Sequence, residues 1–216
     1  FSFNIYDKLK VKNLAINSSI LINSSQLKRN NLIAKNFIEI NEFIDLKDHE
    51  IKASYANKKL FIEGKGQVKL QNKFELINYK LNNNGSNLNL VSNIELSEID
   101  IKNQNLIKKY FPNTKNILNL KDHKININYK NNILSLKGLG KIKLENEFNK
   151  IGYSFSKKNK KYNFETDLEV NDAPLQIDII NYEKNKKFNS ELRIIGSYTK
   201  KTGLDLKKIG LISKDN

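Results

Sequence analysis

Residues 120–144 read LKDHKININYKNNILSLKGLGKIKL, and residues 46–70 read LKDHEIKASYANKKLFIEGKGQVKL. Both stretches alternate apolar and polar residues, pass through a turn that contains asparagine, and alternate again around a pair of glycines. Alternation with a period of two places apolar side chains on one face of a β-strand and polar side chains on the other. Each stretch therefore predicts a β-hairpin with one apolar face.

The similarity between the two stretches extends along most of the chain. At an offset of about 74 residues, 13–86 and 87–160 share roughly 26 identities, where a composition this biased would give about 7 by chance. We expect one continuous β-repeat segment over residues 1–216, with units 13–86, 87–160 and a partial unit 161–216. The chain opens on Phe1 within an alternating pattern and has no Met, so we expect it to be part of a longer protein.

Each full unit is expected to hold four or five strands of roughly 8–12 residues and one short helix. The expected helices are Gln26–Phe37 and Ile101–Phe111, the second capped by Asp100 and ended by Pro112. After Pro174 the sequence alternates, so the third unit is expected to be extended there.

The alternation changes phase in each full unit. In the first unit the change falls between Phe74 and Ile77, near Leu76, and in the second it falls between Phe148 and Ile151. One extra residue in a strand would produce such a change, so we expect a β-bulge or bend at these two places.

The net charge of +15 comes almost entirely from lysine, since Arg29 and Arg193 are the only arginines among 38 basic residues. Arginine is the preferred residue for forked contacts with phosphate and guanine, so we expect no nucleic-acid partner. The basicity has two interpretations: drift toward residues of A/T-rich codons on solvated faces, or a preference for anionic surfaces such as lipid headgroups.

Two small motifs superficially suggest chemistry. Gly64-Lys65-Gly66 and Gly138-Leu139-Gly140 resemble part of a phosphate loop, but both lie inside expected strands, where glycines mark a bend or close backbone approach. His49 and His123 are copies of each other, and we expect each to form a hydrogen bond at a turn or strand edge. We therefore expect no catalytic residue, no metal site, no cofactor and no enzyme.

An antiparallel sheet with one apolar face needs a cover for that face. One short helix per unit is too little to cover four or five strands. The sheet must either pack against itself, as in a sandwich or solenoid, or form a trough filled by a ligand.

The chain resembles the AsmA-like family of periplasmic bridge-like lipid transport proteins, of the YhdP and TamB type. The resemblance rests on the long alternating strands, the helix that ends near Tyr110-Phe111-Pro112, and the stretch Ile133–Leu144. The third unit adds Ile179–Lys184 and Leu192–Gly196.

This resemblance implies a mainly β fold: a repeating antiparallel β-groove, a curved and twisted half-pipe, with about one short helix per repeat. It implies a protein of Gram-negative bacteria that serves outer-membrane biogenesis in the periplasm, anchored to the inner membrane by a region outside this segment. The implied partners are phospholipid acyl chains and, through other regions, components of both membranes. The groove is expected to be lined by Leu14, Ile16, Leu60, Ile62, Leu88, Leu90, Leu134, Leu136, Ile142, Leu144, Phe164 and Leu168. The alternative is a structural or adhesive β-repeat with a self-packed core and no ligand.

Overall fold

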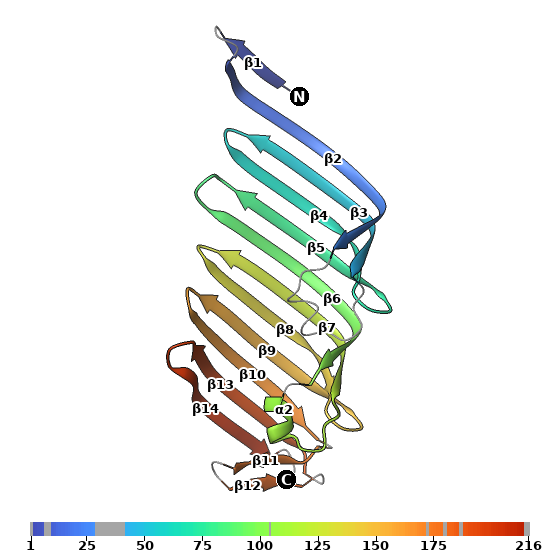
Figure 1. Ribbon diagram of the computed structural model, residues 1–216, viewed down its shortest axis with the longest axis vertical. Helices are drawn as coiled ribbons and strands as arrows, with labels where there is room; N and C mark the ends of the chain where they lie inside the picture. Colours follow the sequence, from blue (N-terminus) through green and yellow to red (C-terminus); the bar gives the residue numbers. More distant parts are fainter. Residues whose placement is uncertain are drawn as a thin grey trace.

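The described part of the chain folds into an open antiparallel β-sheet accompanied by one short helix and a small two-stranded sheet (Figure 1). In the computed structural model, the described residues are 2–6, 10–28, 42–103, 105–171, 173–178, 181–185 and 188–213. The main sheet has 12 strands in the order β1-β2-β3-β4-β5-β6-β7-β8-β9-β10-β13-β14, and β11 pairs with β12. The expected mainly β, antiparallel fold is confirmed.

Seven strands have the predicted 8–12 residues. Four are longer, with 19 residues in β2, 15 in β6 and 14 in both β3 and β7. The bounds of the strands are β1 Ser2–Tyr6, β2 Lys10–Lys28, β3 Phe43–Ala56, β4 Lys59–Lys69, β5 Phe74–Asn83, β6 Leu88–Lys102, β7 Ile117–Lys130, β8 Ile133–Lys143, β9 Phe148–Lys158, β10 Lys161–Val170, β11 Leu175–Ile177, β12 Tyr182–Lys184, β13 Ser190–Thr199 and β14 Gly203–Ser213. The helix is α2, Asn105–Tyr110.

Short turns join β3 to β4, β5 to β6, β7 to β8, β9 to β10 and β13 to β14, and they lie along one edge of the sheet (left in Figure 1). Asn57 and Lys58 have φ values of 50° and 62°, and Asn131 and Asn132 have values of 51° and 59°. Two successive residues with positive φ are typical of the type I′ hairpin turn, whose twist matches that of the flanking strands.

The β-bulges lie at Asp48 and Asp122, so their predicted position near Leu76 and Phe148 is wrong. The β3–β4 register shifts between Lys47 and Glu50, and the β7–β8 register shifts at the corresponding place. Asp48 and Asp122 have φ values of 52° and 55°, in the left-handed region that aspartate enters more readily than most residues. β4–β5 and β8–β9 pair without any shift.

The apparent phase change has a different origin, because Phe74 lies on the polar face of the sheet. The ammonium groups of Lys47 and Lys69 lie 5.7 and 5.9 Å from the centre of its ring. Phe148 has the same environment beneath Lys121 and Lys143, at 5.5 and 5.9 Å. A cation over the aromatic face is attracted by the ring quadrupole, which makes an exposed phenylalanine acceptable on a polar surface.

The helix prediction is right in existence and end but wrong in start, because α2 begins at Asn105 and Asp100 still belongs to β6. Gln71 supplies the reason: its side-chain amide donates to the Asp100 carbonyl oxygen at 2.8 Å and accepts from the Asp100 N–H at 2.9 Å. On the β5 side these two bonds take the place of a neighbouring strand, and on the other side residues 100–102 pair with β7, so the backbone stays extended.

Of the other predicted helix, Gln26–Phe37, the first three residues are extended in β2, which contradicts the prediction there, and 29–41 lie outside the described residues. The extended conformation predicted after Pro174 is confirmed by β11, Leu175–Ile177.

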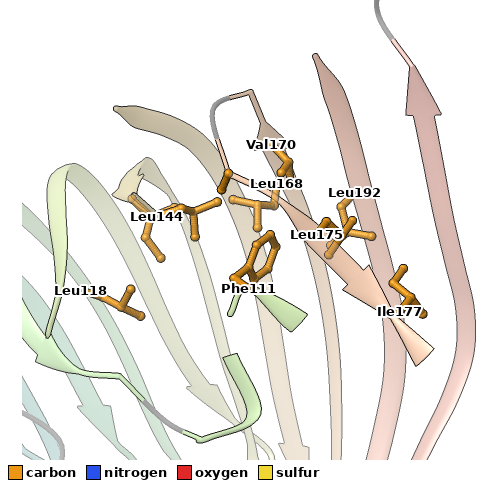
Figure 2. Packing of buried hydrophobic residues seen from close by; sticks show 10 residues of the cluster. Phe111, Leu118, Leu144, Leu168, Val170, Leu175, Ile177 and Leu192 are labelled. Carbon is orange, nitrogen blue, oxygen red and sulfur yellow. The ribbon is translucent and has the colours of Figure 1, made fainter. Parts of the chain in front are cut away.

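The best-packed core lies at the C-terminal end of the apolar face, where α2 and β11 cover the strands (Figure 2). Phe111, Leu175 and Ile177 point from these covering elements toward Leu168 and Leu192 on the sheet. All five side chains are buried. The sequence pattern did not predict this cover.

Candidate functional site

Strand pairing places one row of residues side by side on the apolar face across eleven strands. The row consists of Ile20, Ile51, Gly64, Tyr79, Ser92, Ile127, Leu136, Phe155, Phe164, Gly196 and Leu206. Residues two positions away along each strand form parallel rows on the same face, except where a bulge intervenes. The opposite face carries hydrogen-bonded asparagines, as between Asn93 and Asn78, and ion pairs such as Lys65–Glu50.

The register brings eleven of the twelve predicted lining residues to this one face, and Leu144, just beyond β8, joins the buried cluster on it. Three of them, Ile142, Leu144 and Leu168, are buried beneath the cover, whereas Leu88 is 42% exposed. The remaining eight are partly exposed. The predicted lining residues therefore share one face of the sheet but differ in exposure to solvent. Those at the C-terminal end lie beneath the cover, and those in the middle are open.

A cavity of about 320 Å³ lies between the cover and the sheet. It is bounded by α2 and β11 on one side and by strands β8, β9, β10, β13 and β14 on the other. The side chains that line it are Ile107, Tyr110, Phe111, Ile142, Leu144, Ile151, Phe164, Thr166, Leu168, Leu175, Ile177, Leu192, Ile194, Leu204, Leu206 and Ile209. This lining is nearly all hydrocarbon, so the cavity suits an apolar chain.

The paired glycines make room for aromatic rings on the apolar face. A Cβ atom at Gly138 would lie 2.2 Å from Cζ of Tyr153, and one at Gly140 would lie 2.3 Å from Cδ2 of His123. The same packing occurs in the first unit, where Gly64 lies under Tyr79 and Gly66 under His49. The glycines therefore allow the rings to approach the backbone closely, which was one of their two predicted roles.

His123 is held at the β7 bulge by two hydrogen bonds and is only 1% exposed. Its Nε2 lies 2.9 Å from the Lys141 carbonyl oxygen, which can only accept, so Nε2 carries the proton and donates. Nδ1 then accepts from the Tyr153 hydroxyl at 3.1 Å. His49 donates to the Gln67 carbonyl oxygen in the same way, at 2.9 Å. The predicted hydrogen bond is confirmed, but it pins a bulge rather than a turn.

Burial lowers the pKa of His123 below its ordinary value of 6.5, although the Lys141 carbonyl and the nearby Asp122 oppose the shift. As pH falls through 6.5 the unfolded chain takes up this proton before the folded chain does. The free energy of unfolding should therefore decrease below pH 6.5, by at most about 1.4 kcal/mol per pH unit for this group.

Urea unfolding between pH 7 and 5, compared with the His123→Gln variant, checks this prediction. The stability advantage of the wild-type chain over the variant should shrink as the pH falls. An advantage that stays constant would contradict it.

Comparison with protein-family models, with curated proteins and with solved structures finds no match. Among the described residues, no helix is long and apolar enough to cross a membrane. The function is therefore argued from the apolar face and its cavity.

Proposed function

We propose that this chain is a section of an AsmA-like bridge-like lipid transport protein. Its apolar face carries phospholipid along a β-groove in the periplasm, between an inner membrane to which another region anchors it and the outer membrane. The proposal assigns it no enzymatic activity.

The observation that carries this proposal is the apolar cavity of about 320 Å³ between the cover and the sheet. From Phe164 in the cavity lining, the register leads through Phe155 to Leu136 on the partly exposed face, so an acyl chain has an apolar path beyond the cavity. Each methylene removed from water contributes about 0.8 kcal/mol. The rows of Leu and Ile hold hydrocarbon without fixing one position, which suits passage along the face.

The alternative function, a structural or adhesive β-repeat, is favoured by the cover itself. α2 and β11 bury Leu144, Leu168 and Leu192 with protein side chains rather than with a ligand. If the same kind of cover extended over the whole face, no lipid would be needed.

Native mass spectrometry with lipid extraction distinguishes the two functions. We expect phospholipid to co-purify with the chain from a bacterial periplasm, and to decrease about tenfold or more in Leu136→Asp, because a carboxylate would be buried among hydrocarbon. Leu136 is half-buried in the middle of the apolar face.

Leu139→Asp is the matched control, since Leu139 lies on the same strand but on the polar face and is 69% exposed. It should retain lipid, and circular dichroism should show strands in all three proteins. A folded wild-type chain free of lipid would overturn the transport proposal and favour the structural one.

A further inference from the structure

The side of the sheet where short turns join the strands carries a strong excess of positive charge. Nine lysines gather there: Lys58, Lys59, Lys130, Lys157, Lys158, Lys160, Lys161, Lys200 and Lys201. The five turn segments, residues 55–61, 82–89, 129–134, 156–163 and 198–204, are fully described and contain no Asp or Glu. We call these nine lysines the turn rim; it runs along the left edge of the sheet in Figure 1.

One lysine of the turn rim belongs to the apolar face. Strand pairing places Lys157 in a row with Leu134, Tyr162, Tyr198 and Leu204. Among the described residues of β3–β10, β13 and β14, it is the one lysine or arginine that the register puts on this face. A lysine at the border of a hydrocarbon surface keeps its stem on that surface and its ammonium group at the polar edge.

One aromatic ring lies beside this ammonium group, and two further rings pack against that ring. Lys157 Nζ lies 5.5 Å from the centre of the Tyr162 ring, which in turn lies 5.8 Å from the Phe155 ring and 6.0 Å from the Tyr198 ring. The two tyrosines bring hydroxyl groups that can donate hydrogen bonds. The same hairpin adds Lys158, Lys160 and Lys161, of which the register places Lys158 and Lys161 on the opposite face. The carboxylate of Asp205, just beyond the last turn segment, lies on the opposite face beside Ser197. On the apolar face, cations and hydroxyl donors form a site complementary to an anion.

The apolar cavity reaches this site. Leu204, which lines the cavity, pairs with Tyr198, and Phe164 lines it two residues from Tyr162. From Thr166, which lines the cavity, to Tyr162 the strand runs four residues, or about 13 Å. One leaflet of bilayer hydrocarbon is about 15 Å thick, so a chain lying on this strand would bring its polar head to the turn rim.

We propose that Lys157, Tyr162, Tyr198 and the adjacent turn lysines bind the phosphate-bearing anionic head of an amphiphile whose hydrocarbon chain occupies the cavity. This inference rests on the proposed function and specifies its ligand. It gives the ligand a fixed orientation, with the head at the hairpin turns and the chain pointing toward α2. It also favours anionic heads over neutral ones, since no acidic residue lies in the turn segments.

Titration calorimetry with single-chain amphiphiles of equal chain length tests the inference. The probes are lysophosphatidylglycerol, which is anionic, monoacylglycerol, which is neutral, and inorganic phosphate. The chain should bind the anionic probe at least about tenfold more tightly than the neutral one, and added salt should reduce this ratio.

The informative variant replaces Lys157, Lys158, Lys160 and Lys161 with glutamine. In this variant the ratio of the affinities for the anionic and the neutral probe should fall toward one. The matched control replaces four exposed lysines of the polar face, Lys52, Lys124, Lys137 and Lys208, and should keep the ratio. Both sets remove the same charge, so a loss confined to the first set locates the site at the turn rim.

The remaining outcomes separate the two proposals. Equal binding of the anionic and neutral probes would overturn the head site and leave the lipid-carrying face standing. Binding of neither probe would overturn both proposals. Inorganic phosphate bound as tightly as the anionic amphiphile would make the turn rim a site for free phosphate and overturn its assignment to a lipid head.

Discussion

Replacing Gly138 with alanine is expected to destabilise the fold by about 1–3 kcal/mol, the usual cost of overpacking. The added Cβ would lie 2.2 Å from Cζ of Tyr153, far inside van der Waals contact. Tyr153 has little freedom to move, because its hydroxyl donates to His123 at the bulge. The free energy of unfolding in urea measures the loss.

Gly210→Ala is the matched control, because the nearest atom to its added Cβ is Lys208 Cε at 3.9 Å. Its stability should be unchanged or slightly higher, since alanine lowers the entropy of the unfolded chain. In a Gly138→Ala/Tyr153→Ala double variant the clash is absent, so the losses should be less than additive. Strict additivity would show that the ring and the glycine do not interact.

Truncating Phe111 to alanine should cost about 3–5 kcal/mol, as is typical for removing a buried phenylalanine. Phe111 follows α2 and packs with Leu168 and Leu175 at the centre of the cover (Figure 2). The change also joins the volume of the lost ring to the adjoining cavity, so the site cannot easily collapse. Urea unfolding monitored by circular dichroism gives the measurement.

Phe188→Ala provides the comparison for this variant. Phe188 is the same residue type but is 52% exposed, so its loss should change stability by less than about 0.5 kcal/mol. Similar losses for the two phenylalanines would mean that the cover of α2 and β11 contributes little to the fold.

Alternation along the strands was sufficient to predict the two faces of the sheet. Leu60 and Ile62, or Leu134 and Leu136, lie on the face expected because a period of two fixes the side of every second residue. The bulges were misplaced because Phe74 was assigned to the apolar face by its hydrophobicity, whereas lysines make it acceptable on the other face.

A local signal for the true bulge was present in the repeated Asp-His pair. Aspartate tolerates positive φ, and a glycine stands opposite each histidine to admit its ring. The start of α2 depended on Gln71, which lies 29 residues from Asp100. The covered cavity likewise depended on β11 folding back over distant strands. Contacts between residues so far apart leave no periodic trace in the sequence.

The neighbour-to-neighbour order of the main sheet has a consequence for how such a chain acquires its structure. Except where β13 follows β10 across residues 171–189, every strand pairs with the strand next in the chain. The entropy lost in closing each connection then depends on that connection's own length, and not on how many hairpins have already formed. Local contacts of this kind allow rapid folding, and they let a nucleus in any hairpin grow outward in both directions. Adding strands to such a sheet therefore lengthens it without raising the kinetic barrier to forming it.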